Sequence, residues 1–237
     1  MADGITLWKC LQATPAADVR RRAAVVDAMQ RADAHSRWGD KASPAPTRFG
    51  AADRYAWNDG GGQSTVWYFL PDGRVLLTVF DHEEDLNLYA EGDHRTQLAL
   101  YDGVPDDLKG IVLNQRETYE ALSIRDPETG QTVLAASGVY WYDGTRWHIA
   151  EGLTRYIAEH HSEADDGAPG QHRPSPARRV VDEFNAAGFS WCMSPYLLGQ
   201  DFTEETVLAK LEADGLLDKG ADHWTRITRE AFECLPG

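Results

Sequence analysis

Two apolar runs on either side of a turn dominate the hydrophobic pattern of the chain. Residues 65–70 and 74–80 are rich in the aromatic, β-branched and aliphatic side chains that are typical of buried strands. Between them, Asp72-Gly73 suits a tight turn, because glycine tolerates positive φ. We therefore predict a central antiparallel hairpin on which the rest of the chain packs.

Further strand patterns lie on both sides of this hairpin. One comes before it, and three come after it as a meander whose last turn is Asp143-Gly144. Together they predict an α+β fold with a mostly antiparallel, twisted sheet of about six strands and helices packed on it. The predicted strands are residues 48–57, 65–70, 74–80, 119–125, 132–141 and 146–150.

Helical spacing of apolar residues first appears after Thr14-Pro15 and continues to about Ala34. Thr14 has a hydroxyl that could cap this helix, and Pro15 suits the first helical position because it has no N–H to leave unpaired. The predicted buried side consists of Val19, Ala23, Val26 and either Met29 or Gln30.

Shorter helices follow elsewhere in the chain. Asp81 with Glu84, and Asp201 with Glu204, have the spacing of a capping box. The shorter predicted helices are residues 86–92, 105–112 and 177–187, and a further helical segment after Asp201 that carries Thr206, Val207, Leu208, Leu211, Leu216 and Leu217.

Three consecutive arginines, Arg20, Arg21 and Arg22, lie in the long predicted helix. Successive helical residues are about 100° apart, so the three side chains fan around the helix and form no single patch. We expect them on solvated faces and reject a phosphate site.

The apolar pattern disappears between residues 160 and 176, where Pro, Gly, Ser and acidic residues gather. We therefore divide the chain into an α+β core domain (1–159), a polar linker or loop (160–176) and a small helical C-terminal segment packed on the core (177–237). A closing strand is predicted at residues 224–228. The order of helix, turn and strand in this segment resembles a winged helix in outline.

The charge of the chain limits its partners. It carries 38 acidic residues against 23 basic ones, a formal net charge of −15. This field repels phosphate backbones and anionic membranes, so we expect no nucleic-acid partner and no membrane partner. Residues 177–237 themselves hold six basic and eleven acidic residues, which also argues against a DNA-binding winged helix. The acidic field suits a basic protein partner, or solubility alone.

No run approaches the roughly 18 apolar residues of a membrane helix, and the N-terminus lacks the pattern of a signal peptide. We expect a cytoplasmic protein. The distant cysteines Cys10, Cys192 and Cys234 suit reduced thiols better than disulfides. The excess of Arg over Lys suggests a GC-rich bacterial genome.

The densest ionisable cluster is Asp81-His82-Glu83-Glu84-Asp85. Carboxylates beside an imidazole could bind a divalent cation or perform acid–base chemistry, with His82 and Glu83 as the candidate catalytic residues. The spacing matches neither an HExxH motif nor a calcium loop, and helix capping accounts for the acids. We expect no metal and no cofactor.

Two other groups have alternative interpretations. His160, His161 and His172 lie in the polar loop, which offers no fixed geometry for zinc. Cys192, between Trp191 and Met193, is interpreted as a small buried hydrophobe and not as a nucleophile paired with His223.

Aromatic residues concentrate in the predicted strands. Neighbours in a strand face opposite sides of the sheet, so Trp67 and Tyr68, or Trp141 and Tyr142, cannot share one face. We name Trp67, Trp141, Tyr142 and Trp147 as candidate interaction residues, because an exposed aromatic patch with an acidic rim suits a basic surface.

These features favour a non-enzymatic interaction or inhibitor protein of the immunity type that binds a basic partner. In its general character the chain is loosely similar to bacterial toxin-immunity proteins of the mixed α/β kind. Two alternatives stay open: an enzyme with an acid–base or metal site at residues 81–85, and a module that binds a small ligand in an aromatic cavity.

Overall fold

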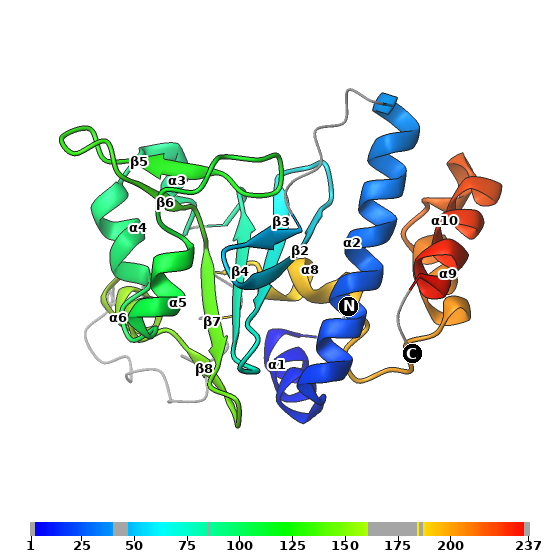
Figure 1. Ribbon diagram of the computed structural model, residues 1–237, viewed down its shortest axis with the longest axis horizontal. Helices are drawn as coiled ribbons and strands as arrows, with labels where there is room; N and C mark the ends of the chain where they lie inside the picture. Colours follow the sequence, from blue (N-terminus) through cyan, green and yellow to red (C-terminus); the bar gives the residue numbers. More distant parts are fainter. Residues whose placement is uncertain (1–2, 40–46, 85, 161–183, 185–186, 235–237) are drawn as a thin grey trace, which may run out of the picture.

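A six-stranded antiparallel sheet forms the centre of the protein (Figure 1). The computed structural model describes residues 3–39, 47–84, 86–160, 184 and 187–234, and over these ranges the strand order is β1-β2-β3-β4-β7-β8. The strands are β1 (Arg48–Phe49), β2 (Ala52–Asn58), β3 (Gln63–Phe69), β4 (Val75–Asp81), β7 (Gly138–Tyr142) and β8 (Trp147–Ile149). Two further strands, β5 (Ser123–Arg125) and β6 (Thr132–Leu134), pair in a small separate sheet. The predicted α+β class and the mostly antiparallel sheet are confirmed.

The predicted central hairpin is β3 and β4, joined by the turn at Asp72 and Gly73. Trp67 lies opposite Leu77 in its register. Every residue of both strands is buried, because helices or loops cover both faces of the sheet. This explains why the two runs are mostly apolar and do not alternate regularly with polar residues.

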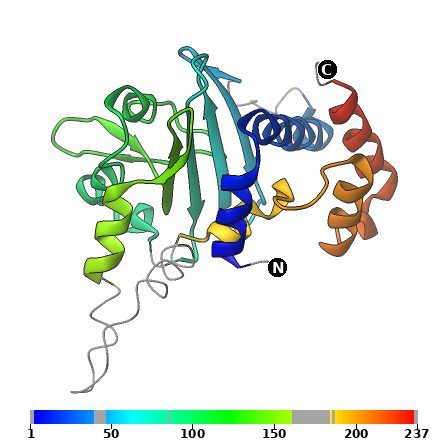
Figure 2. The same cartoon turned by 90° about the horizontal axis from the view of Figure 1, so that it is seen from below.

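Helices lie on both faces of the sheet (Figures 1 and 2). The first face is covered by α1 (Gly4–Ala13), α2 (Ala16–Trp38) and α8 (Phe189–Met193). The other face is covered by the small sheet, α4 (His94–Leu100), α5 (Asp106–Ile111) and α6 (Glu151–His160), with the short α3 (Leu88–Glu91) beside α4. None of the described helices has the length and apolar character needed to cross a membrane.

Neighbouring aromatic residues face opposite sides of the sheet, as predicted. The Trp67 ring stacks on Phe69 and meets Tyr196 edge to face on the side of α2. The Tyr68 hydroxyl instead donates to Oε1 of Gln115 at 3.0 Å on the opposite side. Both side chains are completely buried. Alternate residues of these strands therefore point to two buried faces of the sheet, and neither face is exposed to solvent.

The long helix α2 confirms the predicted apolar face, with Val19, Ala23, Val26 and Met29 all buried. Its predicted cap is wrong. Pro15 is the N-cap residue, no side chain caps the helix, and the Thr14 hydroxyl donates to the Cys10 carbonyl at the end of α1.

The expectation that three arginines of α2 lie on solvated faces is wrong for Arg22. Arg20 and Arg21 are about half exposed, but Arg22 is only 6% exposed. Its guanidinium donates to backbone carbonyls of the segment that follows α8. A buried guanidinium needs such acceptors, because burial without hydrogen bonds is costly.

The last helices lie outside α2, on the side away from the sheet (Figure 2). They are α9 (Glu204–Ala213), η3 (Leu217–Lys219) and α10 (Ala221–Glu233), whereas η2 (Ser194–Tyr196) follows α8 and packs Tyr196 against Trp67 of the sheet. The closing strand predicted at residues 224–228 is therefore wrong, because these residues belong to α10. The resemblance to a winged helix depended on that strand and is wrong as well. Ile227, Thr228 and Ala231 repeat at helical spacing and are buried, so their packing overrides the β-rich composition.

Two other predictions, the strand at residues 132–141 and the helix caps, are corrected. Residues 132–141 do not form one strand: β6 ends at Leu134, and β7 begins at Gly138 in the other sheet, so the meander is wrong. The caps of α3 and α9 are Asn87 and Thr203, not Asp81 and Asp201. The polar segment 160–176 and the helix predicted at 177–187 fall outside the described residues, except for His160, Phe184 and Ala187.

Candidate functional site

The turn between β2 and β3, residues 59–62, is built around one carboxylate. Oδ1 of Asp59 accepts hydrogen bonds from the backbone N–H groups of Gly61 at 2.7 Å and Gln63 at 3.1 Å. Oδ2 accepts from the indole Nε1 of Trp191 at 3.2 Å. Asp59 is exposed, yet these three bonds fix where its charge points.

Trp191 is held in place by the docking of α8 against the sheet. The Thr65 hydroxyl donates to the carbonyl of Cys192 at 2.8 Å, and Gly188 packs against Asp81, where a β-carbon would come within 2.4 Å of the Asp81 side chain. The indole is nevertheless 46% exposed. A rigid helix therefore presents a large aromatic ring to solvent beside Asp59.

Tyr119 lies near Gly60 of the same turn and is 68% exposed. The side-chain amide of Asn58 donates to the Tyr119 carbonyl at 3.3 Å, which fixes this segment against the end of β2. The Tyr119 hydroxyl reaches the space above Gly60. We call residues 59–62, His82, Glu83, Tyr119 and Trp191 the β2–β3 turn surface.

The candidate catalytic residues His82 and Glu83 belong to this surface. Both are exposed, with Nε2 of His82 4.0 Å from a carboxylate oxygen of Glu83, and the imidazole lies against Gly62. Asp81 is buried and accepts from Nε2 of Gln63 at 2.9 Å, so it closes the β3–β4 pair. Within the described ranges, no three His, Cys, Asp or Glu side chains are arranged to hold a metal ion.

The structure separates the four aromatic residues named from the sequence. Trp67 is completely buried and Trp147 is 5% exposed, so neither presents a surface to a partner in this structure. Their burial follows from the helices that cover the first face of the sheet. The other two, Trp141 and Tyr142, are partly exposed. The Trp141 ring stacks on the His148 ring with 4.2 Å between the ring centroids, and Tyr142 lies beside Trp147.

The turn between β7 and β8 is fixed by Asp143. Its pKa is held well below its usual value by hydrogen bonds from the Thr145 hydroxyl, from His148 and from the Arg146 backbone N–H, in that order. Nε2 of His148 lies 2.7 Å from Oδ2 of Asp143. This contact positions the imidazole that stacks on Trp141, so the arrangement supports the hairpin.

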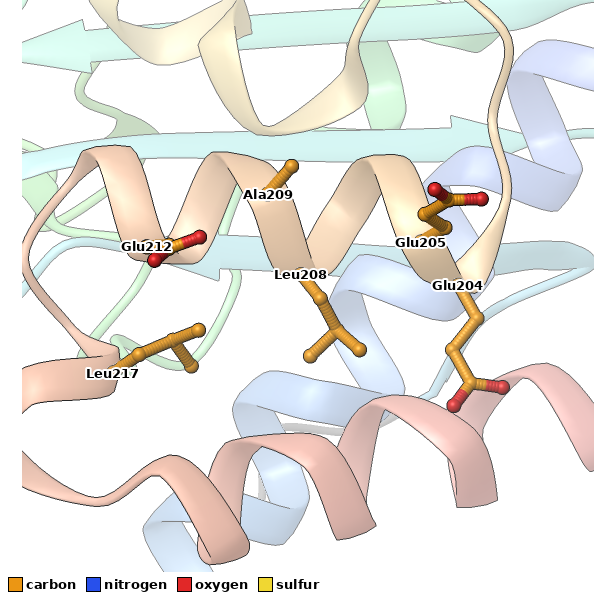
Figure 3. A pocket seen from close by; sticks show the side chains of 6 residues that line it. All are labelled: Glu204, Glu205, Leu208, Ala209, Glu212 and Leu217. Atoms are coloured by element: carbon orange, nitrogen blue, oxygen red, sulfur yellow. The ribbon is translucent and has the colours of Figure 1, made fainter.

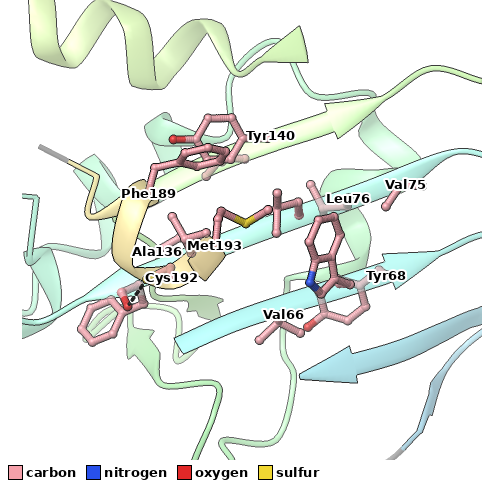
Figure 4. Close-up of a cluster of buried hydrophobic side chains, with 14 of the residues drawn as sticks. Val66, Tyr68, Val75, Leu76, Ala136, Tyr140, Phe189, Cys192 and Met193 are labelled. Atoms are coloured by element: carbon pink, nitrogen blue, oxygen red, sulfur yellow. Dashed lines mark hydrogen bonds between the residues drawn. The ribbon is translucent and has the colours of Figure 1, made fainter. Parts of the chain in front are cut away.

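Cys192 lies in the core, as predicted, beside Phe189 and Met193 (Figure 4). Burial, and then the nearby charges of Asp81 and Asp59, raise the pKa of its thiol. The thiol donates to the Phe80 carbonyl at 3.4 Å. His223 pairs instead with Asp33 of α2 at 3.1 Å. Cys192 is therefore a structural residue.

A groove of about 540 Å³ lies in the C-terminal helices (Figure 3). Oε1 of Glu204 is 3.4 Å from Nε of Arg229 on α10. The groove combines apolar and acidic side chains and holds no aromatic ring, so it differs from the aromatic cavity that a ligand-binding module would need. It is lined by Glu204, Glu205, Leu208, Ala209, Glu212 and Leu217.

The patterns in the sequence did not mark Asp59, Tyr119 or Trp191 as candidate site residues. An Asn-Asp pair before three glycines signals a turn built on side-chain oxygens, and this signal is present at residues 58–62. No comparable signal brings Tyr119 and Trp191 to that turn, because they lie 57 and 129 positions beyond residue 62 in the chain.

The fold and this surface define an α+β protein with helices on both faces of an antiparallel sheet and an exposed aromatic and acidic turn at one end. Comparison of the chain with protein-family models, with curated proteins and with solved structures returns no match.

Proposed function

We propose that this protein is a non-enzymatic interaction or inhibitor protein of the immunity type, and that its β2–β3 turn surface binds a basic protein partner. One observation carries the proposal: two large aromatic side chains, Trp191 and Tyr119, are exposed at the turn that holds the exposed carboxylate of Asp59. Aromatic anchors surrounded by charged groups are typical of the energetic centre of protein interfaces.

The charge of the protein supports a basic partner. The net charge is −15, and Glu83 adds an exposed carboxylate to the turn surface. A field of one sign accelerates the encounter with an oppositely charged protein and orients the approach. Salt screens such attraction, with a Debye length of about 10 Å at 0.1 M ionic strength. Binding should therefore weaken strongly as the salt concentration rises.

A capture experiment tests this proposal. The immobilised protein is exposed to an extract of the source cell at low and at high salt, and the retained basic protein is identified and then purified to measure its affinity. We expect retention at low salt, loss at high salt, and loss from the double variant Trp191→Ala, Tyr119→Ala. Trp38→Ala is the matched control, because Trp38 is 66% exposed at the end of α2. If no basic protein is retained at low salt, the proposal is wrong.

The two alternatives have less support. An acid–base enzyme would depend on His82 and Glu83, which lie side by side on an open surface. Loss of a measured activity in the variants His82→Ala and Glu83→Ala would favour it. A small-ligand module would need an aromatic cavity, and the groove at α9 has no aromatic ring among its lining residues. A thermal-shift screen with the variant Leu208→Glu would test whether that groove binds a ligand.

A further inference from the structure

Glycines let the β2–β3 turn approach its neighbouring side chains closely. Gly60 and Gly62 adopt φ of +80° and +111°, which favour glycine, and a β-carbon at Gly62 would come within 2.2 Å of the His82 ring. The imidazole therefore covers the turn at Gly62, while Asp59 and Trp191 remain exposed. A group that approaches from solvent meets the Asp59 carboxylate and the Trp191 indole together, because the two side chains are hydrogen-bonded.

The Asp59 carboxylate at the start of this turn is preorganised and keeps spare hydrogen-bonding capacity. A carboxylate has about four lone-pair sites, and three hydrogen bonds from Gly61, Gln63 and Trp191 occupy part of them. Among the described residues, no Lys or Arg forms an ion pair with Asp59. Because these hydrogen bonds already fix the Asp59 side chain, the side chain loses little further conformational entropy when a cation binds to it.

Trp191 adds attraction for a cation. Its Nε1–H donates to Asp59, so the edge of the indole is held at the carboxylate while 46% of the residue remains exposed. A cation over an indole face is attracted by the ring quadrupole, and tryptophan is the best of the aromatic residues for this contact. A carboxylate and an indole face side by side therefore select a positively charged group that can stack.

We propose that the β2–β3 turn surface binds an arginine side chain of the partner, with the guanidinium stacked on the Trp191 indole and donating to the Asp59 carboxylate. A guanidinium is planar, stacks on aromatic rings and donates along a fixed fork, whereas the compact ammonium of lysine does not stack. The Tyr119 hydroxyl lies near Gly60 of the same turn. This inference rests on the proposed function, because it names the group by which the basic partner is recognised.

The test uses the full chain and three short peptides. The peptides are identical except at two positions, where they carry arginine, lysine or the neutral isostere citrulline. Binding is followed by NMR through the Trp191 indole N–H and the amide signals of Gly60, Gly61 and Gly62. We expect the arginine peptide to shift these signals, the lysine peptide to bind more weakly, and the citrulline peptide to leave them in place.

Matched variants separate the two contacts. Asp59→Asn keeps an oxygen acceptor for the turn but removes the charge, and Trp191→Phe keeps a ring but removes the indole N–H. We expect each to weaken the arginine peptide at least about fivefold, in keeping with a cation–π or charge-assisted contact. Trp38→Ala should leave the affinity unchanged. Thermal unfolding of every variant shows whether the fold is retained.

The outcomes distinguish this inference from the proposed function. Equal affinity for the arginine and citrulline peptides, or unchanged arginine binding in folded Asp59→Asn and Trp191→Phe, would overturn the arginine site. If those variants still bind the purified basic partner with unchanged affinity, the arginine site is wrong while the proposed function stands. If the arginine peptide binds at the turn but no basic protein is captured, the proposed function fails and the arginine site stands.

Discussion

Arg22 of α2 donates through Nη1 to the carbonyl oxygen of Leu197 at 2.6 Å, across 175 positions of the sequence. The same guanidinium donates to the carbonyls of Tyr196 and Gln200, both at 2.9 Å. Leu197 adopts a φ of +48°, which is unusual for a residue with a β-carbon. Burial lowers the pKa of Arg22, partly offset by Asp18. One arginine thus connects the long helix to the segment that leads into the C-terminal helices.

We predict that Arg22→Met lowers the free energy of unfolding by about 3 kcal/mol, because buried carbonyls lose charge-assisted donors. Arg20→Met, on the same helix but 46% exposed at its side chain, should change it by less than about 1 kcal/mol. Urea unfolding of both variants gives the measurement. Equal effects of the two substitutions would contradict the assigned role of Arg22.

Gly152 allows α6 to approach α4 closely. A β-carbon there would lie 1.8 Å from the Ala99 carbonyl oxygen, and this backbone atom cannot move independently of its helix. We predict that Gly152→Ala destabilises the protein by about 3 kcal/mol or more. Gly110 of α5 is the control, because a β-carbon at Gly110 would meet nothing within 4 Å. Gly110→Ala should raise the stability by up to about 1 kcal/mol, since alanine is the better helix former. Thermal unfolding of both variants checks the pair, and a stable Gly152→Ala would contradict the close approach.

The Asp143 turn should contribute stability that depends on pH. The carboxyl pKa is lowered from its usual 3.8 in the folded state, so the folded state binds this proton less readily than the unfolded state. The contribution is complete above the usual pKa and is lost as the pH falls below 3.8 towards the lowered value. The variant Thr145→Val removes the strongest cause, and we predict that the Asp143 pKa rises towards 3.8 in an NMR titration. The pKa of Asp126, lowered first by the Thr129 hydroxyl, should stay unchanged. An Asp143 pKa that does not move would show that Thr145 is not its main cause.

The three thiols should differ in reactivity. Cys192 is completely buried with a raised pKa, whereas Cys234 is exposed and Cys10 is intermediate. Only the thiolate is nucleophilic, so we predict that iodoacetamide modifies Cys234 first and Cys192 only when the protein unfolds. Mass spectrometry of timed digests identifies each site. Rapid modification of Cys192 in the native protein would contradict its place in the core.

The pattern of apolar residues was sufficient for the central sheet but not for its connections. The β3–β4 hairpin follows from local composition and from Asp72-Gly73, and both signals agree. Residues 132–141 have the same strand-like composition, yet Ser137 interrupts them. Its hydroxyl donates to the Ala187 carbonyl, and its N–H donates to the Val79 carbonyl. Partners this distant in sequence leave no trace in a local pattern.

The candidate site was predictable only in part. The sequence indicated His82 and Glu83, and the structure places them on the same surface as Asp59. The aromatic residues chosen from the strands included Trp67 and Trp147, which are buried. The exposure of these aromatic side chains does not follow from the sequence, because a strand has the same residue pattern whether a helix or water covers its face.

By itself the sequence determined which segments are extended or helical wherever local composition, turn residues and spacing agreed, and it determined the acidic net charge. The tertiary structure alone decided what covers each face. That choice buried Arg22 and Trp67, made a helix of residues 224–228, and brought Trp191 to Asp59. The physical reason is that burial depends on contacts between distant segments, and these contacts outweigh the small free-energy differences that local propensity provides.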